Sequence, residues 1–145
     1  MCPNEIHQKI LSVMKRWQKI EDISVASTGR IMEQTENPMI HLVMEIIQRD
    51  SLMHHLVQQM VIDSLEREAI SLSPDELNLV WDGIEKHIEI EKQTIEMGES
   101  VLQAMRGKKM VIQEYLVKYL LTDEEKHNLM LEDLEEVKKG MYPYG

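Results

Sequence analysis

The segment Ser71-Leu72-Ser73-Pro74-Asp75-Glu76 interrupts the chain near its middle and predicts the start of a helix. The hydroxyl of Ser73 can accept a hydrogen bond from the amide of the third helical residue. Pro74 suits the first helical position, where no amide hydrogen is needed, and Glu76 completes a capping box. A helix is therefore expected to begin at residue 74.

Three further breaks divide the rest of the chain. Asn37-Pro38 repeats the signal of a capping residue followed by proline, and Gly107 can take the left-handed conformation that ends a helix. A last stop lies at Gly140, ahead of Pro143. The segments between these breaks contain no internal proline and follow a helical period. They predict helices over about 4–35, 38–71, 74–106 and 108–139.

Short loops between long helices force neighbouring helices to run antiparallel. Residues 1–145 are therefore expected to form a single all-α domain, an antiparallel up-down-up-down four-helix bundle. The composition agrees, since 43% of the residues are apolar, with 12 Met and no Phe. Such a core suits helix packing better than a sandwich of aromatic-rich strands.

Charge and cysteine content exclude several classes of protein. The net charge of −10 repels the phosphate backbone, so no nucleic-acid partner is expected. Cys2 is the only cysteine, which excludes an internal disulfide, a four-cysteine zinc site and a rubredoxin-type iron centre. No apolar stretch approaches about 18 residues, and no cationic segment precedes an apolar run at the N-terminus. We expect a soluble cytoplasmic protein without a membrane partner.

Each predicted helix carries an apolar stripe at spacings of three and four, and ionisable residues interrupt every stripe near its middle. At a rise of about 1.5 Å per residue, the interruptions lie within one or two turns of a common level. Antiparallel packing would bring them into one layer of the core. The members of this polar layer are Glu21, Asp50, His54, His87, Glu91, Asp123, Glu124 and His127.

Burying several carboxylates together is unfavourable unless a cation is shared between them. Carboxylates and imidazoles at helical spacing suit iron, manganese or zinc, so the polar layer predicts a metal site. Asp50 and Asp123 could instead orient the histidines through the other ring nitrogen. The layer could also bind no metal and only fix the register of the helices.

A weak internal repeat relates the two halves of the chain. Residues 49–56 align with residues 122–129, and residues 17–21 align with residues 87–91. The repeat pairs members of the polar layer, Glu21 with Glu91 and His54 with His127. Trp17 stands at the position equivalent to His87, which weakens the case for His87 as a ligand.

The pattern resembles the ferritin-like superfamily, particularly its rubrerythrin-like di-iron bundles. These proteins place a Glu on the first and third helices and a Glu-x-x-His on the second and fourth. Glu21 and Glu91 match the lone glutamates, and Glu124-x-x-His127 matches the fourth-helix motif. The second helix departs from the pattern, because Ser51 stands where a Glu should precede His54, unless Asp50 substitutes.

The resemblance implies two iron ions, and either iron oxidation or the reduction of oxygen or peroxide, with electrons from a separate donor protein. Ser51 favours an alternative, a metal-binding or sensing protein without turnover. A homodimer is also expected, because such bundles often expose one apolar helix face. The candidate apolar positions outside the main stripes are Ile23, Met32, Met39, Met44, Leu72 and Leu79.

Overall fold

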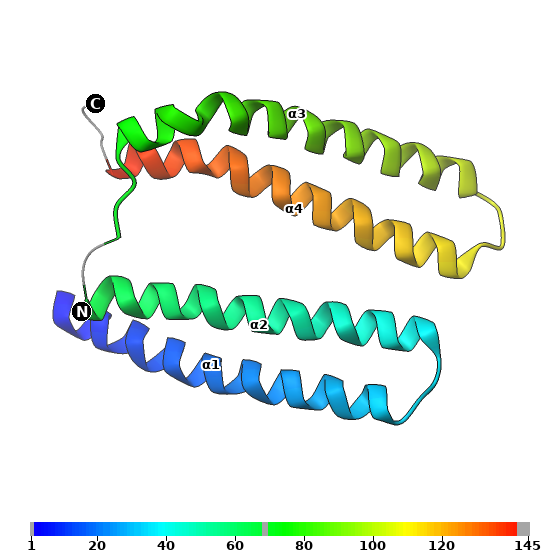
Figure 1. Cartoon of the computed structure of the whole chain (residues 1–145), viewed down its shortest axis with the longest axis horizontal. Coiled ribbons are helices and arrows are strands. Elements are labelled where there is room, and N and C mark those ends of the chain that lie inside the picture. Colours follow the sequence, from blue (N-terminus) through cyan, green and yellow to red (C-terminus); the bar gives the residue numbers. More distant parts are fainter. Residues whose placement is uncertain (1, 68–69, 142–145) are drawn as a thin grey trace. The chain divides into compact units, whose positions relative to one another are not determined.

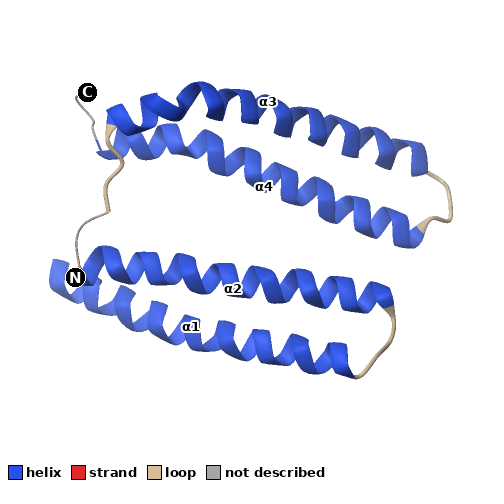
Figure 2. Ribbon diagram, viewed as in Figure 1, coloured by secondary structure: helices blue, strands red, loops and turns tan. Residues whose placement is uncertain are grey.

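The computed structural model describes residues 2–67 and 70–141 of the chain. It contains the helices α1 (Pro3–Glu33), α2 (Pro38–Glu66), α3 (Pro74–Met105) and α4 (Val111–Met141) (Figures 1 and 2). No strand occurs among these residues. The prediction of an all-α fold with four long helices is confirmed for the described part of the chain.

The predicted starts of α2 and α3 are correct, and side chains make both caps. The Ser73 hydroxyl accepts from the amide of Glu76 at 3.1 Å, and the Glu76 carboxylate accepts from the amide of Ser73 at 3.0 Å. The side chain of Asn37 accepts from the amides of Met39 and Ile40. These contacts satisfy amides that the first helical turn leaves without partners.

Two predicted boundaries are wrong. α2 ends at Glu66 rather than at residue 71, and the backbone of Arg67 has already left the helical region. α4 begins at Val111 rather than at residue 108, because Gly107 takes a φ of 71° and the chain needs a further short stretch before it turns into a helix. Both differences lie at helix ends, where local sequence signals are weakest.

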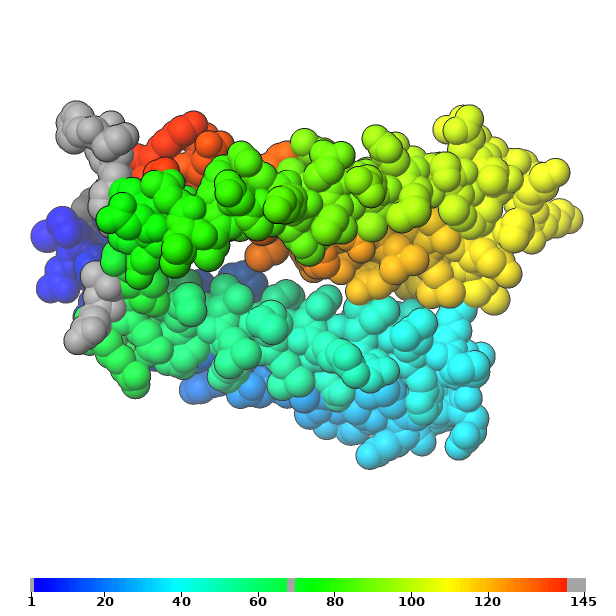
Figure 3. All heavy atoms as spheres, turned by 45° about the horizontal axis from the view of Figure 1, so that its top comes forward, coloured from blue at the N-terminus to red at the C-terminus, as the bar shows by residue number. Residues whose placement is uncertain are grey.

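The chain divides into two compact units, Met1–Ile70 and Ser71–Gly145. In the first unit α1 packs antiparallel against α2, and in the second α3 packs antiparallel against α4 (Figure 1). In the space-filling view the atoms of α3 lie directly against those of α4, and the atoms of α2 lie directly against those of α1 (Figure 3). We call these pairs the first and the second hairpin. The single four-helix bundle over residues 1–145 stays a prediction.

Large apolar side chains are poorly covered within the hairpins. Among the described residues only Ile62, Leu77 and Met105 form a buried apolar core, while many large apolar residues of both hairpins are exposed. Large exposed apolar patches are typical of surfaces that contact another surface. None of the described helices is both long and apolar enough to span a bilayer.

The middle of each hairpin seam is polar instead. Glu21 in the first hairpin is 7% exposed, and Glu91 in the second is 5% exposed. Ser51, Thr28 and Gln58 of the first hairpin are also buried. A buried carboxylate is costly unless donors, a proton or a cation compensate its charge.

Candidate metal centre

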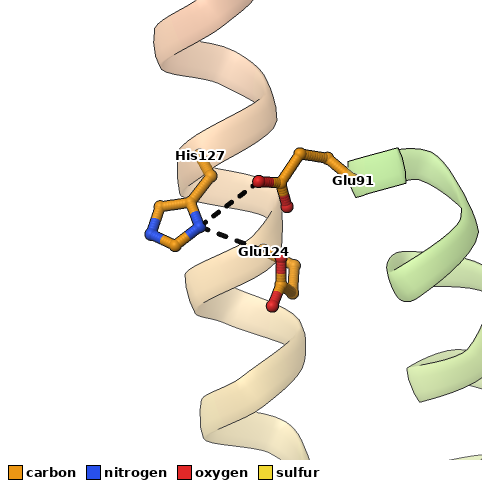
Figure 4. A group of neighbouring side chains, drawn as sticks. All are labelled: Glu91, Glu124 and His127. Carbon is orange, nitrogen blue, oxygen red and sulfur yellow. Dashed lines mark ion pairs between the residues drawn. The ribbon is translucent and has the colours of Figure 1, made fainter. Parts of the chain in front are cut away.

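Three predicted site residues meet in the second hairpin. Glu91 extends from α3 towards Glu124 and His127, which lie one turn apart on α4 (Figure 4). One ligand atom from each lies within 4.8 Å of the others. Nδ1 of His127 is 3.6 Å from Oε1 of Glu91 and 3.8 Å from Oε2 of Glu124. The spacing of three residues places both α4 side chains on the helix face that meets α3.

Glu91 is the least satisfied member of this cluster. Its Oε1 accepts from Nε2 of His87, one turn earlier on α3, at 2.9 Å. Its Oε2 is buried and has no hydrogen-bond partner among the described residues. A buried carboxylate oxygen without a donor is strongly unfavourable, which leaves room for a proton or a cation.

The carboxyl groups of Glu91 and Glu124 shift each other's pKa in opposite directions. The hydrogen bond from Glu124 is the largest influence on Glu91 and lowers its pKa, with help from His87 and His127 against the effect of burial. The same hydrogen bond raises the pKa of Glu124, and burial and the charge of Glu91 raise it further. A cation between Glu91 and Glu124 would stabilise both carboxylates, because it offers each of them a positive partner.

Asp123 lies on the other side of the His127 ring. Its Oδ2 is 3.3 Å from Nε2 of His127, while its Oδ1 pairs with Nζ of Lys126 at 2.6 Å. His127 therefore turns Nδ1 towards the two glutamates and Nε2 towards Asp123. The geometry matches the predicted alternative in which Asp123 orients the histidine.

The first hairpin contains a second cluster, around Glu21. Nδ1 of His54 is 3.2 Å from Oε1 of Glu21, and the indole nitrogen of Trp17 donates to the same oxygen at 2.9 Å. The hydroxyl of Ser51 also bonds to Glu21, and its oxygen lies 2.9 Å from that of Ser24. Burial by itself would raise the pKa of Glu21, but Ser51, His54 and Trp17 outweigh it and lower this pKa.

Asp50 belongs to neither cluster. It is exposed on α2, and no hydrogen bond or ion pair joins it to the described residues. The suggestion that it replaces the carboxylate missing at Ser51 gains no support from this placement. Each hairpin thus gathers its own members of the polar layer, and a common layer across four helices stays a prediction.

Some contributors were not anticipated from the sequence. Trp17 was taken as a position that cannot bind metal, but it donates to Glu21. Thr94 was not considered, yet its hydroxyl donates to Oε2 of Glu124 at 3.3 Å. The spacing of four residues between Trp17 and Glu21 is the signal that could have revealed the first contact.

The internal repeat holds at the level of atoms. In both hairpins a ring nitrogen four residues before the buried glutamate bonds to it, from Trp17 and from His87. In both, the histidine of the second helix faces this glutamate. Comparison of the chain with protein-family models, with curated proteins and with solved structures gives no match.

Proposed function

We propose that this protein binds a transition-metal ion, iron foremost, through Glu91, Glu124 and His127. One observation carries the proposal: Oε2 of Glu91 is buried without a hydrogen-bond partner beside a second carboxylate and an imidazole. A cation would satisfy that oxygen and remove the repulsion between the two carboxylates when both are ionised.

The donor set indicates which ions fit. Two carboxylate oxygens and one imidazole nitrogen suit iron and manganese, and zinc is compatible. Asp123 would hold the His127 ring with Nδ1 towards the ion, and His87 stands one turn away as a further nitrogen donor. Three protein ligands leave coordination positions free for an external molecule.

The resemblance to rubrerythrin-like proteins extends the proposal to redox chemistry. Iron at such a centre supplies electrons to oxygen or peroxide, so we propose iron oxidation or peroxide reduction, with a separate protein as electron donor. Glu91 and Glu124 would hold the ion between α3 and α4. Metal binding without turnover is the alternative, and Ser51 favours it.

The same proposal includes the assembly. The exposed apolar side chains of the hairpins support a ferritin-like antiparallel bundle, in which helical hairpins cover each other's apolar faces. Ile23 is 64% exposed and Leu79 86% exposed, which supports the predicted homodimer, because such side chains need a partner surface.

Elemental analysis of protein purified without chelator tests metal binding directly. We expect stoichiometric metal in the native chain and none in the Glu124→Ala variant. Glu125→Ala is the matched control, because Glu125 is exposed on the same helix next to the cluster. Absence of stoichiometric metal in the native protein, and of any rise in melting temperature with added Fe²⁺ or Mn²⁺, would mean that the polar residues only fix the helix register.

Aerobic addition of Fe²⁺ tests the redox part separately. A ferric absorbance signal that disappears in Glu124→Ala would support iron oxidation. Uptake of Fe²⁺ without such a signal, and without consumption of peroxide, would leave metal binding in place and exclude turnover.

A further inference from the structure

The cluster of the first hairpin has the same plan as the metal centre but is closed by hydrogen bonds. Glu21 stands where Glu91 stands in the repeat, and His54 stands where His127 stands. The indole N–H of Trp17 donates to Oε1 of Glu21, and Nδ1 of His54 makes a hydrogen bond with the same oxygen. Ser51 also makes a hydrogen bond with this carboxylate. Neither oxygen of Glu21 is both buried and without a partner, unlike Oε2 of Glu91.

Two substitutions between the repeats account for this closure. Ser51 occupies the position of Glu124, so the first hairpin offers a neutral hydroxyl where the second offers a carboxylate. Trp17 occupies the position of His87, and an indole N–H donates a hydrogen bond but has no lone pair for a metal. The contact between Thr94 of α3 and Glu124 of α4 has its counterpart in Ser24 of α1 and Ser51 of α2, whose hydroxyl oxygens lie 2.9 Å apart.

In the first hairpin, hydrogen bonds from the protein thus satisfy the buried glutamate, whereas in the second hairpin we assign this role to a cation. The Glu21 carboxylate accepts from Trp17 and makes hydrogen bonds with His54 and Ser51, which together lower its pKa against the effect of burial. Glu21 and His54 alone provide one carboxylate and one imidazole, which is too few donors to compete with water for an iron ion. Asp50 is exposed and does not add a second carboxylate.

We infer that the first hairpin carries a latent metal position, closed by Trp17 and Ser51, so that each chain holds a single ion, in the second hairpin. This inference rests on the proposed function and departs from the two ions that the rubrerythrin-like resemblance implies. Replacing Ser51 by glutamate would recreate the carboxylate pair beside Glu21 and open the second position.

Anaerobic equilibrium dialysis with Fe²⁺, followed by iron analysis, tests the inference. We expect about one ion per native chain, none for Glu124→Ser, and about two for the double variant Ser51→Glu with Trp17→His. Leu52→Glu is the matched control, since it adds the same charge at an exposed neighbouring position of α2, and it should stay at one ion.

The outcomes separate the inference from the proposed function. Two ions in the native chain overturn the inference and leave the proposed function intact, whereas no ion in the native chain overturns both. One ion in a folded double variant also overturns the inference. Ser51 is 5% exposed, so the double variant could fail to fold. In that event the single variant Glu21→Gln tests the inference instead. Its iron content should equal that of the native chain, and a fall of about half an ion per chain or more would show that the first hairpin also binds iron.

Discussion

Glu21 and Glu91 occupy equivalent places in two hairpins, and both are buried carboxylates with lowered pKa values. The causes differ. Burial would raise the pKa of Glu21, but hydrogen bonds with Ser51, His54 and Trp17 lower it. The pKa of Glu91 is lowered chiefly by its interaction with a second carboxyl group, Glu124. A buried carboxylate that its neighbours satisfy is a structural feature, whereas two carboxyl groups held together are suited to a cation that both can bind.

The largest expected effect separates the two glutamates directly. Glu91→Gln keeps the volume of the side chain but removes its charge, so metal affinity should fall by more than about 100-fold, beyond the loss typical of a group that only orients a ligand. Glu21→Gln should leave the affinity unchanged. Calorimetric titration with Mn²⁺ measures both, and equal losses in the two variants would erase the distinction between the hairpins.

A smaller effect should separate the two aspartates that precede the repeat histidines. Asp123→Asn weakens the contact that holds His127, and we expect metal affinity to fall by roughly 10-fold. Asp50→Asn is the control, because Asp50 is exposed and contacts neither cluster. The same titration measures both variants, and an unchanged affinity in Asp123→Asn would show that the contact does not orient the histidine.

In the first hairpin, removal of a donor should act on stability rather than on metal. Trp17→Phe deletes the indole bond to Glu21 and should lower the free energy of unfolding by about 1 kcal/mol. Trp81→Phe is matched to it, since Trp81 also bonds to a glutamate four residues later, but the Trp81–Glu85 contact is exposed. The control should lose less than about 0.5 kcal/mol. Urea unfolding without metal compares them, and the reverse order would contradict the assignment.

The smallest effect concerns pH. The pKa of Glu124 is raised in the fold, so its contribution to stability is complete at low pH and disappears as pH rises through the raised value. The metal-free protein should therefore lose a few degrees of melting temperature in that range, and Glu124→Gln should lose less. Saturating Mn²⁺ should abolish the loss. Glu21 and Glu91 act oppositely, since their lowered pKa values remove stability only as pH falls through them.

Local chemistry made much of the fold predictable. The caps at Ser73 and Asn37 depend on side chains within three residues of the helix start, so their sequence signals are reliable. The end of α2 was placed five residues too late, because no proline or glycine marks the point at which Arg67 leaves the helix.

The sequence could predict which residues gather at the candidate site, but not what each of them contacts there. Glu91, Glu124 and His127 were expected together, and the structure brings them together. Asp50 and Asp123 stand at equivalent positions in the repeat, yet only Asp123 meets its histidine. The spacing of four residues is the same in α2 and α4, so the directions of the side chains, and not their spacing, separate the two aspartates.

The sequence by itself determined four helices, the proline-led starts of α2 and α3, and the spacing of Glu124 and His127, because each depends on contacts within about one turn. Only the tertiary structure decided which buried glutamate keeps one oxygen without a hydrogen-bond partner. That outcome depends on groups that meet across a seam: His54 and Ser51 reach Glu21 from α2, while Glu124 and His127 approach Glu91 from α4. Burial strengthens these electrostatic contacts, because water can neither screen them nor replace them with its own hydrogen bonds.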